Sequence, residues 1–394
     1  MKKTALFSTL LIVSLSSVQN LHSYQTIDQK IDHFIKKFET EKKSWQGGVI
    51  AIIQGGHVIY QSAFGHTKGK YGPPITAETL FPLASISKFL SAAAIILQTD
   101  RGYLQLDEPF QFSCLKYPVT LKNILSHTTG YQFPGNCEIE KGVSRAQLFK
   151  ILEHQKPTHR PGHGYRYSNT LFSLVQDILI FKGLSFQEAI QDLAYTLNTP
   201  GIQTIPLPSD LTVAHPHIKI DPYGTFKTLP LPRFYPQTVP AAAGVFASLD
   251  GMIAFFKFCF GYRPDLISTA TLNNLFRPLA QNRDIERWSN IPWPCPRNKI
   301  QSSYGLGCRI LTAGPYPDKK LICHSGYLSG ISTFIGFIPS KDIGIIVLAN
   351  QNSGISLKKG IEFWTTIIRE DNKPSLKRRV RMTKSRHRRY RKHC

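Results

Sequence analysis

The sequence predicts an α/β fold of the α+β type, in which one β-sheet is assembled from both ends of the chain around a helical insertion. Three observations lead to this prediction. Strand patterns occur at residues 47–63 and again at residues 304–349. The long segment between them carries mainly helical patterns. The chain has 394 residues, and its hydrophobic content of 42% is enough for a large core.

The N-terminal strands follow an amphipathic helix predicted over residues 27–43. Its apolar face is formed by Ile27, Ile31, Phe34, Ile35 and Phe38. Residues 47–54 and 57–63 are two strand-like runs separated by Gly55-Gly56. A Gly-Gly pair between two such runs is typical of a β-hairpin turn.

The middle of the chain is expected to pack around one buried helix. An apolar run from Phe89 to Leu97 stops before Gly102, a residue that suits a helix C-terminus. Because the run is apolar nearly all round, this helix should be the central helix of a domain. Further helical patterns cover residues 120–130, 144–156, 170–199, 248–260 and 265–283, and a proline-rich loop covers residues 205–240.

Strand patterns return in the last quarter of the chain and are followed by a closing helix. The strands are expected at residues 304–311, 321–324, 331–338 and 343–349, and the helix at residues 356–369. We therefore expect one domain over residues 24–372, with its helical insertion at about residues 85–290. The sequence contains no internal repeat, no phosphate-binding glycine loop and no metal-binding motif, so we expect no cofactor and no metal.

The first 23 residues have the pattern of a secretory signal peptide. Lys2 and Lys3 precede an apolar run from Ala5 to Leu15, and Ser23 is a candidate cleavage position. The run is short for a bilayer-spanning helix, so an uncleaved anchor is the less favoured alternative. We expect a secreted or periplasmic protein.

A basic tail is predicted over residues 373–394. Ten of the last 18 residues are Lys or Arg and none is acidic, and removing these ten charges from the formal net charge of +23 leaves +13. Such a tail favours an anionic partner. Export argues against nucleic acid, as does the lack of aromatic residues interleaved with the basic ones. An anionic envelope polymer or membrane surface fits better, and the alternative is a disordered tail with no dedicated partner.

Seven cysteines are compatible with export but form no dense framework. Cys114 with Cys137 is a plausible disulfide, and so is Cys308 with Cys323 across a hairpin. Ordinary buried thiols are an equal alternative, because pairing cannot be derived from sequence.

Ser85 and Lys88 stand three residues apart at the start of the central helix, on one helical face. A serine hydroxyl becomes nucleophilic when an adjacent base takes its proton, and a partly desolvated lysine can be neutral enough to help. The partial positive charge of the helix N-terminus favours a developing anion. The pair predicts a nucleophile, whereas the alternative for this motif alone is a helix cap beside a solvated lysine.

Two further polar motifs complete the candidate site. Tyr167 and Asn169 open the predicted 170–199 helix. A neighbouring positive charge favours the phenolate of a tyrosine, which can then exchange protons with a serine. The other motif, residues 324–327, ends a strand with His-Ser-Gly-Tyr, and its glycine would let a substrate backbone approach the strand edge. Alone, the first motif suggests a helix cap at Ser168 or Asn169 and the second a structural histidine.

The combination resembles the serine β-lactamase and D,D-peptidase superfamily, in the branch that holds class C β-lactamases, D,D-carboxypeptidases, D-aminopeptidases and related esterases. The similarity extends over about residues 27–369. It rests on Phe-Pro-Leu-Ala-Ser-Ile-Ser-Lys at 81–88, Leu-Asp-Glu-Pro at 106–109, Leu-Ser-His-Thr-Thr-Gly at 125–130, Tyr-Ser-Asn at 167–169, Ala-Gly-Val-Phe at 243–246, Tyr-Gly-Leu-Gly at 304–307 and His-Ser-Gly at 324–326. The fold implied is the β-lactamase/D,D-peptidase-like fold, with an antiparallel sheet flanked by helices, an all-helical lobe and a cleft between them.

The resemblance also implies a role for each candidate residue. Ser85 would be the nucleophile that forms the acyl-enzyme, Lys88 its proton partner and Tyr167 the general acid and base. The substrate-binding residues would be Asn169, His324, Ser325, Gly326 and Tyr327. His324 and Ser325 would hold a substrate carboxylate, and the backbone N–H groups of Ser85 and Tyr327 would form the oxyanion hole.

One departure from the family pattern bears on the substrate. β-Lactamases of this branch usually carry lysine where His324 stands, and histidine at this place is similar to certain D,D-peptidases and D-aminopeptidases. We therefore expect an exported serine hydrolase that acts on peptidoglycan-type peptides as a D,D-carboxypeptidase or D-amino-acid peptidase. The alternatives are an esterase, a weak class C-like β-lactamase, or a non-catalytic penicillin-binding-like envelope module.

Overall fold

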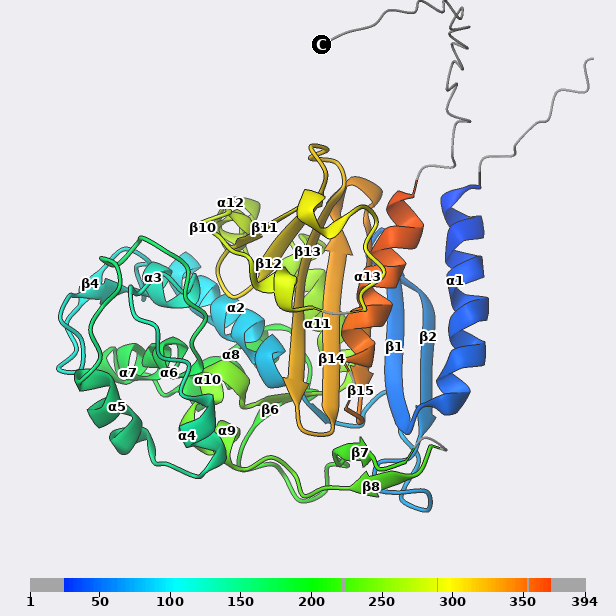
Figure 1. Cartoon of the computed structure of the whole chain (residues 1–394), viewed down its shortest axis with the longest axis horizontal. Helices are drawn as coiled ribbons and strands as arrows, with labels where there is room; N and C mark the ends of the chain where they lie inside the picture. The colour runs from blue at the N-terminus through cyan, green and yellow to red at the C-terminus, as the bar shows by residue number, and fades with distance from the viewer. Residues whose placement is uncertain (1–24, 222–223, 289, 353, 370–394) are drawn as a thin grey trace, which may run out of the picture.

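The computed structural model describes residues 25–221, 224–288, 290–352 and 354–369. The predicted signal peptide and the predicted basic tail lie outside these residues. Figure 1 shows a large sheet with helices α1 and α13 beside it, and a lobe of short helices at the left of the view. None of the helices in the described part of the chain combines the length and apolar character needed to cross a membrane.

The large sheet is built from both ends of the chain, as predicted. Within the described residues it has eight strands in the order β10-β11-β12-β13-β14-β15-β1-β2, and every neighbouring pair is antiparallel. Its strands are β1 (Gly47–Gln54), β2 (His57–Gly65), β10 (Ala280–Gln281), β11 (Ile300–Tyr304), β12 (Arg309–Ala313), β13 (Lys320–Leu328), β14 (Ile331–Ile338) and β15 (Ile343–Ala349). The N-terminal hairpin therefore pairs directly with the last strand, β15.

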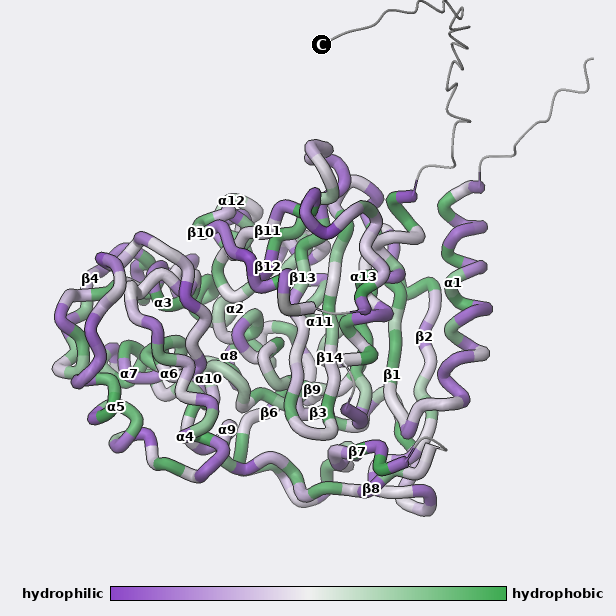
Figure 2. The backbone as a smooth tube through the Cα atoms, in the orientation of Figure 1, coloured by the Kyte–Doolittle hydropathy of each residue, from purple (hydrophilic) through white to green (hydrophobic). Residues whose placement is uncertain are grey.

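The central strands are buried on both faces, which explains their nearly continuous apolar sequence. In β1, Val49 and Ala51 face the core around α2, whereas Ile50 and Ile52 face the core under α1 and α13. Successive side chains of a strand point to opposite faces, so a two-sided core needs apolar residues at every position. Figure 2 shows this apolar run through β1, whereas the edge strand β2 alternates between exposed and half-buried residues.

Helices α1 (Ile27–Glu41) and α13 (Ile355–Ile368) cover one face of the sheet. Thr26 caps α1 through a capping box, which satisfies backbone donors at its first turn. Phe34 of α1 packs against Phe363 of α13 with ring centroids 5.1 Å apart. The buried Lys359 of α13 forms ion pairs with Glu41 and Glu362. The first and last helices of the body are thus joined to each other.

The opposite face carries the central helix and the helical lobe. Its helices are α2 (Ser87–Asp100), α3 (Leu121–Leu125), α4 (Asn136–Glu140), α5 (Arg145–Glu153), α6 (Asn169–Phe172), α7 (Leu174–Phe181), α8 (Phe186–Thr196), α9 (Phe234–Thr238), α10 (Pro240–Ala243), α11 (Leu249–Cys259) and α12 (Thr269–Leu272). Short strands join them: β3 (Phe81–Pro82), β9 (Val245–Ala247) and β6 (Ile202–Thr204) form one small sheet, and β4 (Pro109–Phe110) with β5 (Val119–Thr120) and β7 (His217–Lys219) with β8 (Phe226–Thr228) form two others.

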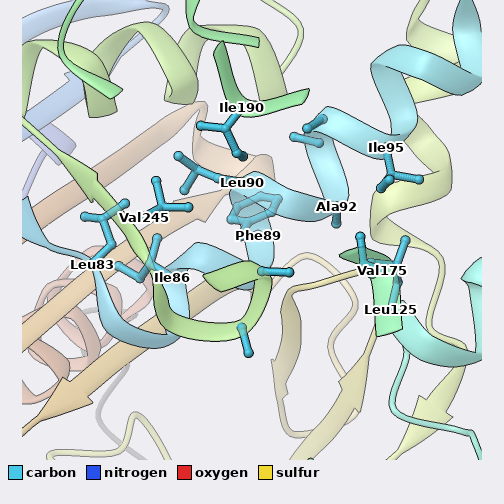
Figure 3. Packing of buried hydrophobic residues seen from close by; sticks show 14 of the residues in the cluster. Leu83, Ile86, Phe89, Leu90, Ala92, Ile95, Leu125, Val175, Ile190 and Val245 are labelled. Atoms are coloured by element: carbon cyan, nitrogen blue, oxygen red, sulfur yellow. The ribbon is translucent and has the colours of Figure 1, made fainter. Parts of the chain in front are cut away.

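Helix α2 is the centre of this core, as its all-round apolar sequence predicted. Figure 3 shows Phe89 and Leu90 of α2 among apolar side chains from several elements, including Leu125, Val175 and Ile190. The side chains from Ser87 to Leu97 are all buried. A helix enclosed in this way holds the residues at its N-terminus in a fixed place.

The helix predicted over residues 120–130 is shorter in the structure, where α3 ends at Leu125, and the loop predicted over residues 205–240 contains β7, β8 and α9. Three further predicted segments also differ. The segment 304–311 is not one strand: β11 ends at Tyr304, residues 305–308 form a turn in which Gly307 adopts φ +68°, and β12 begins at Arg309. Residues 170–199 form three helices, with Gly183 at φ +79° between α7 and α8. The segment 265–283 contains only α12, a 3₁₀ turn (Asn273–Phe276) and the edge strand β10. In each case one long pattern contained a turn.

The two suggested disulfides are not formed. Cys114, Cys137, Cys308 and Cys323 are all free thiols. Cys308 and Cys323 are fully buried, and burial raises the pKa of both thiols. They behave as small apolar core residues, which was the alternative interpretation.

Candidate active site

Ser85 lies in a 3₁₀ turn, η2 (Ala84–Ile86), that leads directly into α2. The residue before it, Ala84, has φ +50°, a left-handed conformation that is unfavourable for residues other than glycine. The carbonyl oxygen of Leu83 accepts a hydrogen bond of 2.8 Å from the Thr333 hydroxyl of β14. The strained turn is therefore held against the sheet, and it presents a partly exposed Ser85.

Gly326 of β13 has a structural role that differs from the predicted one. A Cβ atom at this position would lie 2.2 Å from the Leu83 carbonyl oxygen and 2.2 Å from the Thr333 hydroxyl oxygen. The glycine was expected to let a substrate approach the strand. In the structure it lets the turn that carries Ser85 approach the strand, so it contributes to the site by positioning.

Lys88 is completely buried, and its Nζ atom has three oxygen neighbours. Nζ lies 3.3 Å from Ser85 Oγ, 2.6 Å from Asn169 Oδ1 and 2.9 Å from the Ala242 carbonyl oxygen. Burial lowers the pKa of Lys88 well below its usual value, and the charge of Arg309 lowers it further. Once deprotonated, the amine keeps two N–H groups for Asn169 and the Ala242 carbonyl, and its lone pair can then accept the Ser85 proton. This geometry suits a general base.

Tyr167 is the second partner of Ser85, with its hydroxyl donating to Ser85 Oγ over 2.9 Å. Burial raises the pKa of Tyr167 to about 12, although the Ser85 hydrogen bond and the charge of Arg309 oppose this shift. The expectation that Lys88 favours a phenolate is therefore wrong. Lys88 Nζ lies 4.6 Å from the centre of the Tyr167 ring, against its face, and burial disfavours the charged form of the amine. Tyr167 remains a proton donor in this arrangement.

Asn169 is the first residue of α6, and Ser168 caps this helix by accepting from the Leu171 N–H. The predicted cap is therefore present beside the predicted site residue. The amide oxygen of Asn169 accepts from Lys88, and its nitrogen donates to Asn136 Oδ1 over 2.7 Å. Both ends of the amide are thus engaged with protein groups, whereas a substrate was the expected partner of Asn169.

His324 is 1% exposed, and both of its ring nitrogens have partners. Nδ1 lies 2.9 Å from the Ser325 carbonyl oxygen, and Nε2 lies 2.9 Å from the Tyr304 hydroxyl. These bonds fit a neutral ring that donates from Nδ1 and accepts at Nε2. Burial lowers the pKa of His324 well below 6.5, and the charges of Arg309 and Lys88 add to this effect. His324 was expected to help hold a substrate carboxylate, and in this structure it offers that group neither a charge nor a free ring nitrogen.

Ser325 and Tyr327 of β13 remain accessible beside the Ser85 turn. Ser325 is half-buried, and the side chain of Tyr327 is exposed. The same strand contacts η2 closely through Gly326. The oxyanion hole formed by the backbone N–H groups of Ser85 and Tyr327 stays a prediction. No group of three His, Cys, Asp or Glu side chains that could hold a metal ion occurs in the described parts of the chain.

A family model described as beta-lactamase matches residues 27–361. The chain belongs to the β-lactamase family. Escherichia coli β-lactamase is 23% identical, with 89% of this chain and 95% of that protein covered. The octameric penicillin-binding protein homologue from Pyrococcus abyssi has the same fold, with a TM-score of 0.68, 24% identity and coverage of 86% of this chain and 76% of its own. EstCE1, a hydrolase with promiscuous acyltransferase activity, aligns with a TM-score of 0.65, 17% identity and coverage of 86% and 98%.

Coverage differs among the curated relatives of this β-lactamase-family chain. A penicillin-binding protein of Bacillus subtilis is 30% identical over 176 residues, which are 41% of this chain and 39% of that protein. The chain therefore spans well under half of the length of this relative. It spans 64% of the length of the protein flp of Staphylococcus aureus. The family membership itself rests on the match to residues 27–361.

The structure adds three residues to this β-lactamase-family site that the sequence analysis did not assign. Arg309 is 7% exposed and lies against the Tyr167 ring, 5.6 Å from its centre. Asp284 accepts hydrogen bonds from Arg309 over 2.9 Å and from Tyr165 over 2.8 Å. His127 packs against Tyr167 with ring centroids 4.3 Å apart and the ring planes tilted by 39°. Its Nδ1 accepts from the Ser168 N–H, and burial lowers its pKa well below 6.5.

Only His127 had a signal in the sequence, because it lies in the Leu-Ser-His-Thr-Thr-Gly block at residues 125–130. Arg309 was part of the segment interpreted as one strand, and Asp284 directly follows the predicted helix at residues 265–283. Their relation to Ser85 depends on how distant parts of the chain pack, which no local pattern records.

Proposed function

We propose that this member of the β-lactamase family is an exported D,D-carboxypeptidase or D-amino-acid peptidase that acts on peptidoglycan-type peptides. The chemistry is acyl transfer through Ser85, as befits a chain related to penicillin-binding proteins and serine esterases. The observation that carries the proposal is the placement of both Lys88 Nζ and Tyr167 Oη within 3.3 Å of Ser85 Oγ.

The contacts around Ser85 support a two-step reaction. Lys88 accepts the Ser85 proton as Oγ attacks the substrate carbonyl carbon and the carbonyl oxygen becomes an oxyanion. Tyr167 then supplies a proton to the leaving amine, and the C–N bond breaks to leave an acyl ester on Ser85. In the second step the deprotonated Tyr167 takes a proton from water as the water oxygen attacks the ester carbonyl carbon, the bond from that carbon to Oγ breaks to release the acid, and Oγ regains its proton from Lys88. No cofactor enters either step.

The nature of the nearby charge supports a substrate with a carboxylate. Because His324 is neutral, the permanent cation next to Tyr167 is Arg309. Its Nη1 atom is buried and has no hydrogen-bond partner within the described residues. A buried guanidinium N–H without a partner leaves this positive charge incompletely compensated, which favours a substrate that brings a carboxylate to this side of the site. A peptide that ends in a free D-amino acid carries such a group, whereas a simple ester does not.

An esterase is the second candidate. It is favoured by the burial of His324, because an uncharged residue then occupies the place where related β-lactamases carry lysine. An esterase site needs only the nucleophile, the base and an oxyanion hole, without a cation for the leaving group.

Matched substrates distinguish the two candidates. One acyl-D-Ala-D-Ala peptide is offered with a free C-terminal carboxylate, as its C-terminal amide, and as an uncharged ester of the same acyl group. A peptidase should show a kcat/KM at least roughly tenfold higher for the free carboxylate than for the amide, the size expected for one charged hydrogen bond. Equal values for the two peptides, with hydrolysis of the ester, would favour the esterase. Ser85→Ala serves as the blank for all three substrates.

Export and the basic tail are part of the same proposal, although both segments lie outside the described residues. A signal peptide at residues 1–23 would place the enzyme outside the cytoplasm, where peptidoglycan-type peptides occur. The ten basic residues among the last 18 would hold it at an anionic envelope polymer or membrane surface. Localisation of the full chain fused to a reporter, with and without residues 1–23, tests the first part.

A further inference from the structure

Asp284 and Arg309 form an ion pair beside the site, between two segments far apart from Ser85 in the sequence. Arg309 is the first residue of β12, and Asp284 begins a 3₁₀ turn, η4 (Asp284–Arg287). Arg309 Nη2 lies 2.9 Å from Asp284 Oδ2, and the Arg309 side chain is 9% exposed. Tyr165 donates to the same carboxylate oxygen. The pair therefore links β12, η4 and the loop that carries Tyr167.

The guanidinium of Arg309 is enclosed by aromatic faces. It lies 5.6 Å from the ring centre of Tyr167 and 5.5 Å from those of Tyr304 and Trp288. A planar guanidinium stacks on such faces and keeps its charge at every accessible pH. Its orientation is thus fixed by the carboxylate at one end and by rings around it.

The backbone of this segment is also fixed relative to Lys88. A Cβ atom at Gly307 would lie 2.3 Å from the Lys88 carbonyl oxygen, so the turn before Arg309 is in close contact with α2. The Gly307 N–H donates to the Leu125 carbonyl oxygen over 2.9 Å. The side chains meet at one ring, because Lys88 Nζ lies 4.6 Å and the Arg309 guanidinium 5.6 Å from the centre of the Tyr167 ring.

Among the residues that the structure describes, the groups around Lys88 are cationic or neutral side chains, and no carboxylate is directly bonded to it. Its hydrogen-bond partners are Ser85, Asn169 and the Ala242 carbonyl, and its ring contacts are Tyr167 and Phe172. The titratable groups that interact with it electrostatically are Arg309, His127 and His324. Both histidines are buried and neutral, so Arg309 is the permanent charge among them. The carboxylate of Asp284 is engaged by Arg309 and Tyr165.

We propose that Asp284 and Arg309 are positioning residues for acylation, which hold a permanent positive charge behind Tyr167 and thereby keep the Lys88 amine free to accept the Ser85 proton. The proposal deepens the proposed function and rests on its acyl-transfer chemistry, but not on the identity of the substrate. The ion pair is buried and touches no reacting atom. According to the proposal, it nevertheless has a measurable effect on the reaction.

The direction of the effect follows from the charges. Lys88 acts as a base only when it is unprotonated, so acylation should fail as the pH falls through its pKa. Burial holds this pKa low, and Arg309 lowers it further. Removal of the Arg309 charge should therefore raise the pKa of Lys88 and move the acid limb of the rate profile to higher pH.

The test follows acylation of Ser85 in the purified full chain by an uncharged nitrophenyl ester over a range of pH. An uncharged ester removes any contribution from carboxylate binding. The double variant Arg309→Met with Asp284→Asn removes both charges and avoids an unpaired buried charge. At the pH where the wild type has half its maximal rate, this variant should be slower by roughly tenfold, and the loss should disappear at higher pH. Arg309→Lys keeps the charge and should keep the wild-type acid limb.

A matched control is the Arg145–Asp177 pair, which is also partly buried but lies in the helical lobe. The double variant Arg145→Met with Asp177→Asn should leave the acid limb in place. If the Arg309 double variant does not fold, Arg309→Gln is used instead. It loses the charge but keeps a donor for Asp284, and its acid limb should also move to higher pH.

Three outcomes have distinct meanings. A rate reduced equally at every pH in the Arg309 variants would overturn the proposal and assign the pair a purely structural role. A wild-type chain that no ester acylates at Ser85 would overturn both the proposal and the acyl-transfer function. Acylation by the ester with the predicted shift, but no turnover of D-Ala-D-Ala peptides, would uphold the positioning role and reject only the peptidase assignment.

Discussion

Gly326→Ala should slow acylation although residue 326 contributes no side chain to the site. The added methyl group would lie 2.2 Å from the Leu83 carbonyl oxygen and 2.2 Å from the Thr333 hydroxyl oxygen. The backbone at residue 326 is not left-handed, so alanine is compatible with its conformation. The whole effect should therefore come from contact between β13 and the turn that carries Ser85.

The size of the effect follows from the required displacement. A carbon–oxygen contact relaxes to about 3.2 Å, so the turn must move by about 1 Å relative to the strand. A misplacement of this size can reduce the rate by about 100-fold. Overpacking of a tight contact should also destabilise the fold by about 1–3 kcal/mol. Both Ser85 and the strand that carries Tyr327 would be affected, because the contact joins them.

The assay is the rate of covalent labelling of Ser85 by a fluorescent penicillin or an uncharged ester, together with urea denaturation. Gly183→Ala is the control, since Gly183 has φ +79° and an added methyl group there would meet no atom within 4 Å. It should lose about 1 kcal/mol of stability from backbone strain and keep the wild-type labelling rate. Labelling of folded Gly326→Ala at the wild-type rate would refute the positioning of Ser85 by β13.

Three further predictions concern other parts of the molecule. Tyr167→Phe should lower kcat/KM by about 10²–10⁴ without unfolding the chain, because it removes the proton donor 2.9 Å from Ser85 Oγ; unchanged kinetics would remove Tyr167 from the mechanism. Stability should decrease as the pH falls below 6.5, because His127 and His324 take up a proton when unfolded but are held neutral when folded, each contributing up to about 1.4 kcal/mol per pH unit. In urea titrations at several pH values, His324→Gln should show a shallower dependence, and an equal slope would contradict its neutral burial. Deletion of residues 377–394 should leave ester turnover unchanged but weaken binding to anionic vesicles in a salt-dependent way, since charges are screened over about 8–10 Å at physiological ionic strength; salt-insensitive binding would contradict an electrostatic tail.

The sequence predicted the parts of the fold that local patterns specify. Strands β14 and β15 have the predicted bounds, and β1 begins and ends as predicted because Gly55-Gly56 forces the turn after it. The buried helix α2 followed from its all-round apolar run. Long helical patterns were less reliable, because glycines such as Gly183 interrupt them in a way that periodicity does not show.

In the candidate site, too, the sequence predicted some features and missed others. Ser85, Lys88 and Tyr167 were found from short motifs, and the structure brings their side chains together. The charge state of His324 could not be predicted, since it depends on complete burial and on the hydrogen bond to Tyr304. Arg309 was missed for a related reason: an arginine at the start of a strand is ordinary until packing encloses it among aromatic rings.

The most direct test of the account is identification of the acylated residue. The full chain is incubated with a penicillin and, separately, with an uncharged activated ester, and its peptides are analysed by mass spectrometry. We predict one acyl adduct on Ser85, and no adduct and no turnover in a folded Ser85→Ala variant. An adduct on another residue, or turnover that survives Ser85→Ala, would contradict the assignment of Ser85 as the nucleophile.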